Sequence, residues 1–147
     1  MDRAERGLER WLALGIRPPL ARLDTSGTYL HRTPKDITKL LGNYYLACNI
    51  GVRVRRSTVI VESGSLDVSL YVSRMPRGET IAEVVQATLD DPNEVYSYPL
   101  DKSFDLAFEA GEVTLDWVDR KSGIFLTLAS FPLCIDLVEA LVAAERL

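Results

Sequence analysis

The stretch YYLACNIGVRVR, residues 44–55, decides the fold class, because apolar residues recur in it at every second position. One parity contains Tyr44, Leu46, Cys48, Ile50, Val52 and Val54, and the other contains Tyr45, Asn49, Arg53 and Arg55. Successive side chains of a β-strand point to opposite faces of the sheet. This alternation therefore predicts a strand with one buried face.

Two groups of three strands, each joined by short turns, are expected around this pattern. The first group covers residues 44–55, 58–62 and 66–73, and the second covers residues 104–109, 112–118 and 124–131. Turn sequences separate the strands, notably Ser63-Gly64 and Ala110-Gly111. Connections this short permit only antiparallel neighbours. The chain should therefore form two three-stranded antiparallel β-meanders.

Helices are expected on either side of both meanders. Apolar residues at helical spacing predict helices over residues 2–14 and 79–89, and a closing helix that Ser130 caps and that has Pro132 in its first turn. Thr33-Pro34 is typical of a helix start and predicts a short helix over residues 35–41. The expected order is α-α-βββ-α-βββ-α, which is an α+β arrangement. A chain of 147 residues should form one globular domain, residues 1–147.

Composition and charge narrow the class of protein. No apolar run approaches the ~20 residues that cross a bilayer, and no apolar segment of a secretory signal follows the N-terminus, so we expect a cytoplasmic protein without membrane contact. The net charge is −4, with 11 Lys/Arg against 7 Asp/Glu in residues 1–73 and 6 against 14 in residues 74–147. An acidic chain is poorly suited to neutralising phosphates, so nucleic acid is not expected as a partner. Cys48 and Cys134 lie in apolar patterns typical of inert buried thiols.

No motif in the chain points to catalysis or to a bound metal. His31 is the only histidine, and it lacks the companion residues that a metal site or a catalytic triad requires. The acidic run over residues 90–94 lacks the ligand spacing and the glycine of a calcium loop, and it is better explained as a helix end. We therefore expect no catalytic residue, no metal site and no cofactor.

A basic strip is the first candidate surface. Arg53 and Arg55 share the outward parity of their strand with Tyr45, and Arg56 follows them. Three interpretations are open: the arginines bind nucleic acid beside a stacking aromatic, they bind an acidic protein partner, or they pair with the acidic row of the second meander. That row contains Asp105, Glu109, Glu112 and Asp116.

The last strand of the second meander is the second candidate surface, because it is apolar on both faces. Ile124, Leu126 and Leu128 should point one way, and Phe125, Ala129 and Phe131 the other. Such a strand is either covered on both sides or carries a partner surface. The outward apolar residues proposed to contact a partner are Val118, Phe125 and Phe131.

The segment IFLTLASFPL, residues 124–133, runs into the amphipathic segment LVEALVAAERL, residues 137–147. Together with the element order, this resembles the class I type III secretion chaperones. The resemblance implies a homodimer that holds an extended segment of a partner protein against apolar patches, without cofactor or chemistry. We therefore expect a non-enzymatic protein-binding module. The alternatives are an immunity or antitoxin-type inhibitor of a basic partner, and an enzyme or sensor that binds a small ligand.

Overall fold

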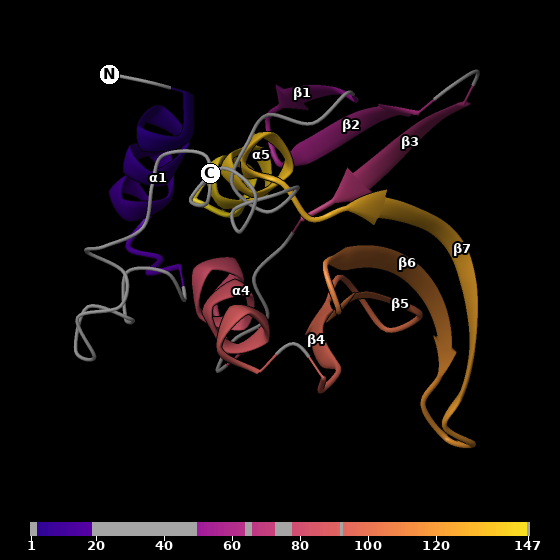
Figure 1. The fold of residues 1–147 in the computed structure, drawn as a ribbon. Helices are drawn as coiled ribbons and strands as arrows, with labels where there is room; N and C mark the ends of the chain where they lie inside the picture. The colour runs from indigo at the N-terminus through magenta and orange to yellow at the C-terminus, as the bar shows by residue number, and fades with distance from the viewer. Residues whose placement is uncertain (1–2, 19–49, 64–65, 73–77, 92, 147) are drawn as a thin grey trace.

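A computed structural model describes residues 3–18, 50–63, 66–72, 78–91 and 93–146 (Figure 1). The helices are α1 (Arg3–Ala13), α4 (Ile81–Asp90) and α5 (Ile135–Glu145). One antiparallel sheet contains β1 (Gly51–Arg55), β2 (Thr58–Ser63) and β3 (Leu66–Tyr71). The other contains β4 (Tyr96–Pro99), β5 (Phe104–Glu109), β6 (Glu112–Asp119) and β7 (Ile124–Pro132). The α+β class predicted from the sequence is confirmed.

The second sheet has four strands, so the prediction of two three-stranded meanders is wrong in this respect. The added strand is β4, which pairs with β5 so that Tyr98 lies opposite Leu106. β4 is short and ends in a proline, and it therefore shows too little alternation to be recognised in the sequence. The helix expected over residues 35–41 lies outside the described residues, as does the first part of the strand expected over 44–55. The described part of that strand is β1, which begins at Gly51.

Local sequence signals explain the turns and helix starts that the structure contains. Ala110 and Gly111 have φ angles of 47° and 82°, the positive values that a two-residue hairpin turn demands at both positions. Helix α4 begins with a capping box, in which the Thr80 side chain accepts a hydrogen bond from the Glu83 backbone N–H and the Glu83 carboxylate accepts one from the Thr80 backbone.

Helix α5 lies at the centre of the molecule. It contacts β1, β2, α4 and α1, and Figure 1 shows it between α1 and the β1–β3 sheet. Its buried residues are Ile135, Leu137, Val138, Ala140, Leu141, Val142 and Ala144. Helix α4 in turn contacts β4 and β5, where Tyr98, Leu106 and Phe108 are buried. One hydrophobic core therefore joins both sheets through α4 and α5.

An ion pair fixes α1 against this central helix. The Arg10 guanidinium donates hydrogen bonds to the Asp136 carboxylate at 2.7 Å and to the Glu139 carboxylate. The hydrogen bonds that Arg10 donates to Glu139 and Asp136 raise the pKa of Arg10 despite the partial burial of its side chain. Trp11, the next residue of α1, is fully buried in the core.

A β-bulge divides β7 into two halves. Ala129 pairs with Leu115 and Thr127 pairs with Asp116, so Leu128 is an extra residue on β7. Because Leu115 and Asp116 are adjacent on β6 and point to opposite faces, the bulge moves Thr127 and Phe125 to the face opposite Ala129 and Phe131. The prediction that Phe125, Ala129 and Phe131 point the same way is therefore wrong.

Cys134 is buried at the start of α5 and forms a disulfide bond, contrary to the expected inert thiol. The only other cysteine of the chain, Cys48, lies outside the described residues. Within the described part of the chain, none of the helices has the length and apolar character that crossing a membrane requires.

The two phenylalanines of β7 should respond very differently to truncation. Phe131 is 2% exposed, whereas Phe125 is 63% exposed. We expect Phe131→Ala to lower the free energy of unfolding by about 3–5 kcal/mol, and Phe125→Ala to change it by less than about 0.5 kcal/mol. Urea denaturation of both variants measures this difference. Equal losses would show that the bulge does not separate the two side chains.

Removing the Arg10 side chain should weaken the attachment of α1 to α5. Since these charge-assisted hydrogen bonds are only partly buried, Arg10→Ala should lower the free energy of unfolding by about 1 kcal/mol. Arg6, which is exposed on the same helix, supplies the control variant Arg6→Ala. The stabilities of the Arg10→Ala and Arg6→Ala variants are compared by thermal unfolding, monitored by circular dichroism. An equal effect of both substitutions would contradict a specific role of Arg10.

Candidate functional site

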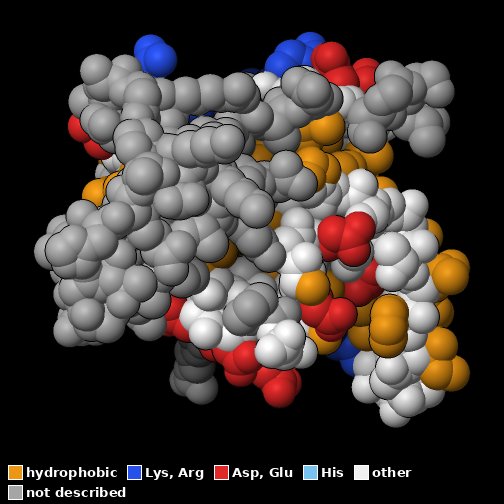
Figure 2. Space-filling view, viewed as in Figure 1, with side chains coloured by type: hydrophobic (Ala, Val, Ile, Leu, Met, Phe, Trp, Pro, Cys, Tyr) orange, Lys and Arg blue, Asp and Glu red, His pale blue; other side chains and the backbone are white. Residues whose placement is uncertain are grey.

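The outer half of β7 is an exposed apolar edge strand. Within the described residues β7 is hydrogen-bonded to β6 alone, so one side of its backbone has no neighbouring strand. Ile124, Phe125, Leu126 and Leu128 are between 52% and 64% exposed. Hydrophobic side chains gather along the corresponding edge of the surface in Figure 2. An unpaired strand that is apolar and exposed is a template for pairing with another chain.

Apolar side chains lie on both faces of this edge. Leu126 lies opposite Trp117 of β6, which is 40% exposed, and Phe125 lies opposite Val118 on the other face. A segment added beside β7 would therefore meet apolar side chains on each of its two faces. We call residues 124–128 the β7 edge.

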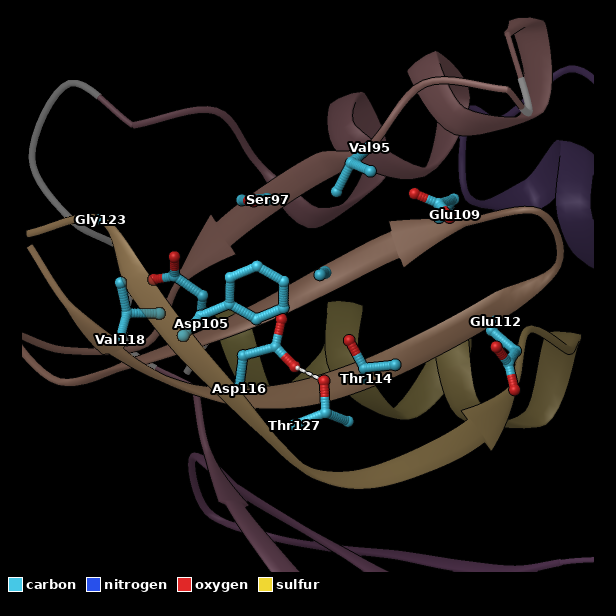
Figure 3. Close-up of a pocket in the computed structure, with 12 residues that line it drawn as sticks. Val95, Ser97, Asp105, Glu109, Glu112, Thr114, Asp116, Val118, Gly123 and Thr127 are labelled. Atoms are coloured by element: carbon cyan, nitrogen blue, oxygen red, sulfur yellow. Dashed lines mark hydrogen bonds between the residues drawn. The ribbon is translucent and has the colours of Figure 1, made fainter.

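One face of the four-stranded sheet is hollow. The buried apolar residues of β4, β5 and β6 point toward the helices, and the residues between them line a hollow of about 330 Å³ on the opposite face (Figure 3). Its lining residues are Val95, Ser97, Asp105, Ala107, Glu109, Glu112, Thr114, Asp116, Val118, Gly123, Phe125 and Thr127. Phe125 and Val118 therefore belong both to the hollow and to the neighbourhood of the β7 edge.

Like charges face one another across the floor of the hollow. Asp105 lies directly opposite Asp116, and Glu109 lies directly opposite Glu112. Like charges at such positions destabilise a sheet. The acidic row predicted from the sequence therefore does lie on one face, and the arrangement concentrates negative charge there.

Arg120 offsets part of this charge. Its guanidinium donates a hydrogen bond to Asp105 at 2.9 Å, and this bond raises the pKa of Arg120. The remaining contacts are with neutral hydroxyls: Thr127 donates to Asp116 at 2.9 Å, and Ser130 donates to Glu112 at 2.8 Å. Figure 3 shows the first of these bonds at the floor of the hollow. Four carboxylates are thus accompanied by a single cation in these described contacts.

The structure separates the residues that the sequence proposed for partner binding. Val118 and Phe125 line the hollow, but Phe131 lies in the core, so the expected exposure of Phe131 is wrong. The sequence did not assign Trp117 to this surface, although it is 40% exposed opposite Leu126. Leu126, which the sequence placed on the face opposite Phe125, also belongs to the β7 edge.

The basic strip lies on the other sheet. Arg53, Arg55 and Arg56 are exposed on β1 and the turn that follows it. Arg53 forms an ion pair with Glu62 of the neighbouring strand at 3.1 Å. Among the described residues, no ion pair joins these arginines to the acidic row, so that interpretation of the strip is not supported.

The described residues contain no group of three or more His, Cys, Asp or Glu side chains that could hold a metal ion. His31 lies outside those residues. Comparisons of the chain with protein-family models, with curated proteins and with solved structures gave no match.

Removing one charge from a facing pair should stabilise the protein. We expect Glu109→Gln to raise the free energy of unfolding by about 0.2–1 kcal/mol, because it relieves the repulsion from Glu112. The gain should shrink at high salt, which screens exposed charges. Glu9→Gln, on the exposed side of α1, removes the same unit of charge and serves as the control. Urea denaturation at low and high salt is the measurement, and equal stability of the two variants would contradict the expectation.

Proposed function

We propose that this protein is a non-enzymatic binding module that holds an extended segment of a partner protein against the β7 edge. The observation that carries the proposal is an edge strand that pairs with β6 alone among the described residues, and whose outer side chains are apolar and exposed on both faces. Strand addition of this kind draws affinity from backbone hydrogen bonds and specificity from contacts with alternate side chains. A chaperone-like role, as in the family that the element order resembles, is consistent with this mode of binding.

A second copy of the chain could occupy the same edge. Two β7 strands related by a twofold axis would cover the apolar side chains of each other, which is the usual symmetry of a homodimer. In that case the partner segment and the second copy would compete for one surface.

The acidic hollow favours a second candidate function, inhibition of a folded basic protein. Clustered carboxylates speed association with a partner of opposite charge. The two candidates differ in the state of the partner. A chaperone-like module should bind an extended or unfolded segment, whereas an inhibitor should bind only the folded domain.

A charge introduced at the β7 edge should abolish partner binding without unfolding the protein. We expect Phe125→Asp to lose a partner that the unsubstituted chain captures near-stoichiometrically from a cross-linked lysate of the source cells, because a desolvated carboxylate at an apolar contact is costly. Tyr71→Asp is the matched control, since Tyr71 is 71% exposed on the first sheet. Circular dichroism should show unchanged secondary structure in both variants.

Three results would contradict the proposal. Capture of the same partner by Phe125→Asp would place the binding site elsewhere. Absence of any protein partner in the unsubstituted preparation would redirect the search to small ligands. Global unfolding of Phe125→Asp would assign the side chain to the core despite its exposure.

A further inference from the structure

The β7 edge and the acidic hollow share one wall, and together they define the chemistry of a segment that could bind there. Resting on the proposed function, we propose that the segment held at β7 presents a lysine or arginine to the hollow and is apolar on both sides of that residue. The negative charge of the hollow favours the basic residue, and the exposed apolar side chains of β7 favour the apolar residues on either side of it.

The position of the basic residue follows from strand geometry. A strand added beside β7 would place one residue next to Thr127 on the hollow face, and Asp116 lies directly across Thr127 on β6. Neighbouring strands lie about 4.8 Å apart, so this residue and Asp116 would be separated by two such spacings. Only a long side chain spans that gap, and a lysine carries its ammonium on a flexible four-carbon stem.

The flanking residues of the segment would meet apolar surface. Residues one position away from the basic residue point to the other face of the sheet, where Leu126 lies with Trp117 of β6 across from it. The residue two positions away toward Phe125 returns to the hollow face, where Val118 lies across from Phe125. Apolar side chains suit all these positions.

Charge complementarity selects a cation over an anion at the central position. Asp116 is only 6% exposed, and its described side-chain partner, the Thr127 hydroxyl, is a neutral donor. A charge that is largely removed from water attracts an opposite charge more strongly than one on an open surface does. A cation would also offset the repulsion between Asp105 and Asp116, whereas a glutamate in the segment would add to it.

Three synthetic peptides test the proposal. Each has the core Val-Val-X-Val-Val between Gly-Ser ends, with lysine, norleucine or glutamate at X, so that norleucine retains the apolar stem without the charge. Their affinities for the full chain are measured by NMR titration at low salt. We expect the lysine peptide to bind about tenfold more tightly than the norleucine peptide, which corresponds to one charge-assisted contact. The glutamate peptide should bind most weakly, and salt should reduce the difference.

Variants assign the preference to the hollow. Asp116→Asn retains an oxygen that accepts the Thr127 hydrogen bond but removes the charge, and it should abolish the preference for lysine. Glu109→Gln, on the exposed rim, should weaken the preference and replaces Asp116→Asn if that variant fails to fold. Asp67→Asn, on the first sheet, should leave the preference unchanged.

The outcomes separate this inference from the proposed function. Equal binding of the lysine and norleucine peptides, both lost in Phe125→Asp, would overturn the basic preference and leave the β7 edge as a binding site. A lysine preference that persists in Phe125→Asp but disappears in Asp116→Asn would overturn binding at the edge and leave charge recognition by the hollow. No binding of any peptide would overturn both. A homodimer that Phe125→Asp dissociates and the lysine peptide does not would show that a second copy occupies the edge.

Discussion

The burial of α5 is the constraint on which the rest of the structure depends. This single helix contacts two strands of the first sheet, β1 and β2, and also α4 and α1. Helix α4 carries the connection onward to β4 and β5. Because α5 is apolar around most of its circumference, it has to be covered on several sides, and the first sheet, α1 and α4 supply that cover. The four-stranded sheet consequently uses one face for the core and leaves its other face hollow.

The bulge at Leu128 converts one continuous apolar strand into two parts with different roles. On the α5 side of the bulge, Ala129 and Phe131 complete the core; beyond it, Phe125 and Thr127 turn toward the acidic hollow. A regular strand would have placed all four side chains on one face. Because of the bulge, one end of this edge strand packs into the core and the other end exposes apolar side chains.

Strand alternation and turn chemistry were sufficient to predict the α+β class, the first meander and the hairpins of the second. They were not sufficient for β4, which is too short to show a period, or for the opposite fates of Phe125 and Phe131. Those fates depend on one inserted residue, and a two-residue period in the sequence contains no mark of it. The acidic row was correctly placed on one face because β5 and β6 are regular, whereas its expected arginine partners belong to a separate sheet. The disulfide at Cys134 was not predicted, because an apolar sequence pattern does not distinguish a buried free thiol from a buried disulfide sulfur.

The central position of α5 has a consequence for the order of events during synthesis. Ribosomes make a chain from its N-terminus, and α5 is made after every other element that the structure describes. Until α5 emerges, its packing surface is missing for β1, β2, α1 and α4. The ion pair of Arg10 also forms late, because its partners Asp136 and Glu139 lie 126 and 129 positions further along the chain. Contacts between such distant residues form slowly, because closing the long intervening loop costs conformational entropy before the contact stabilises the chain. The apolar face of the first sheet therefore stays exposed in the nascent chain until α5 is available, so the packing of β1 and β2 is a late step in folding.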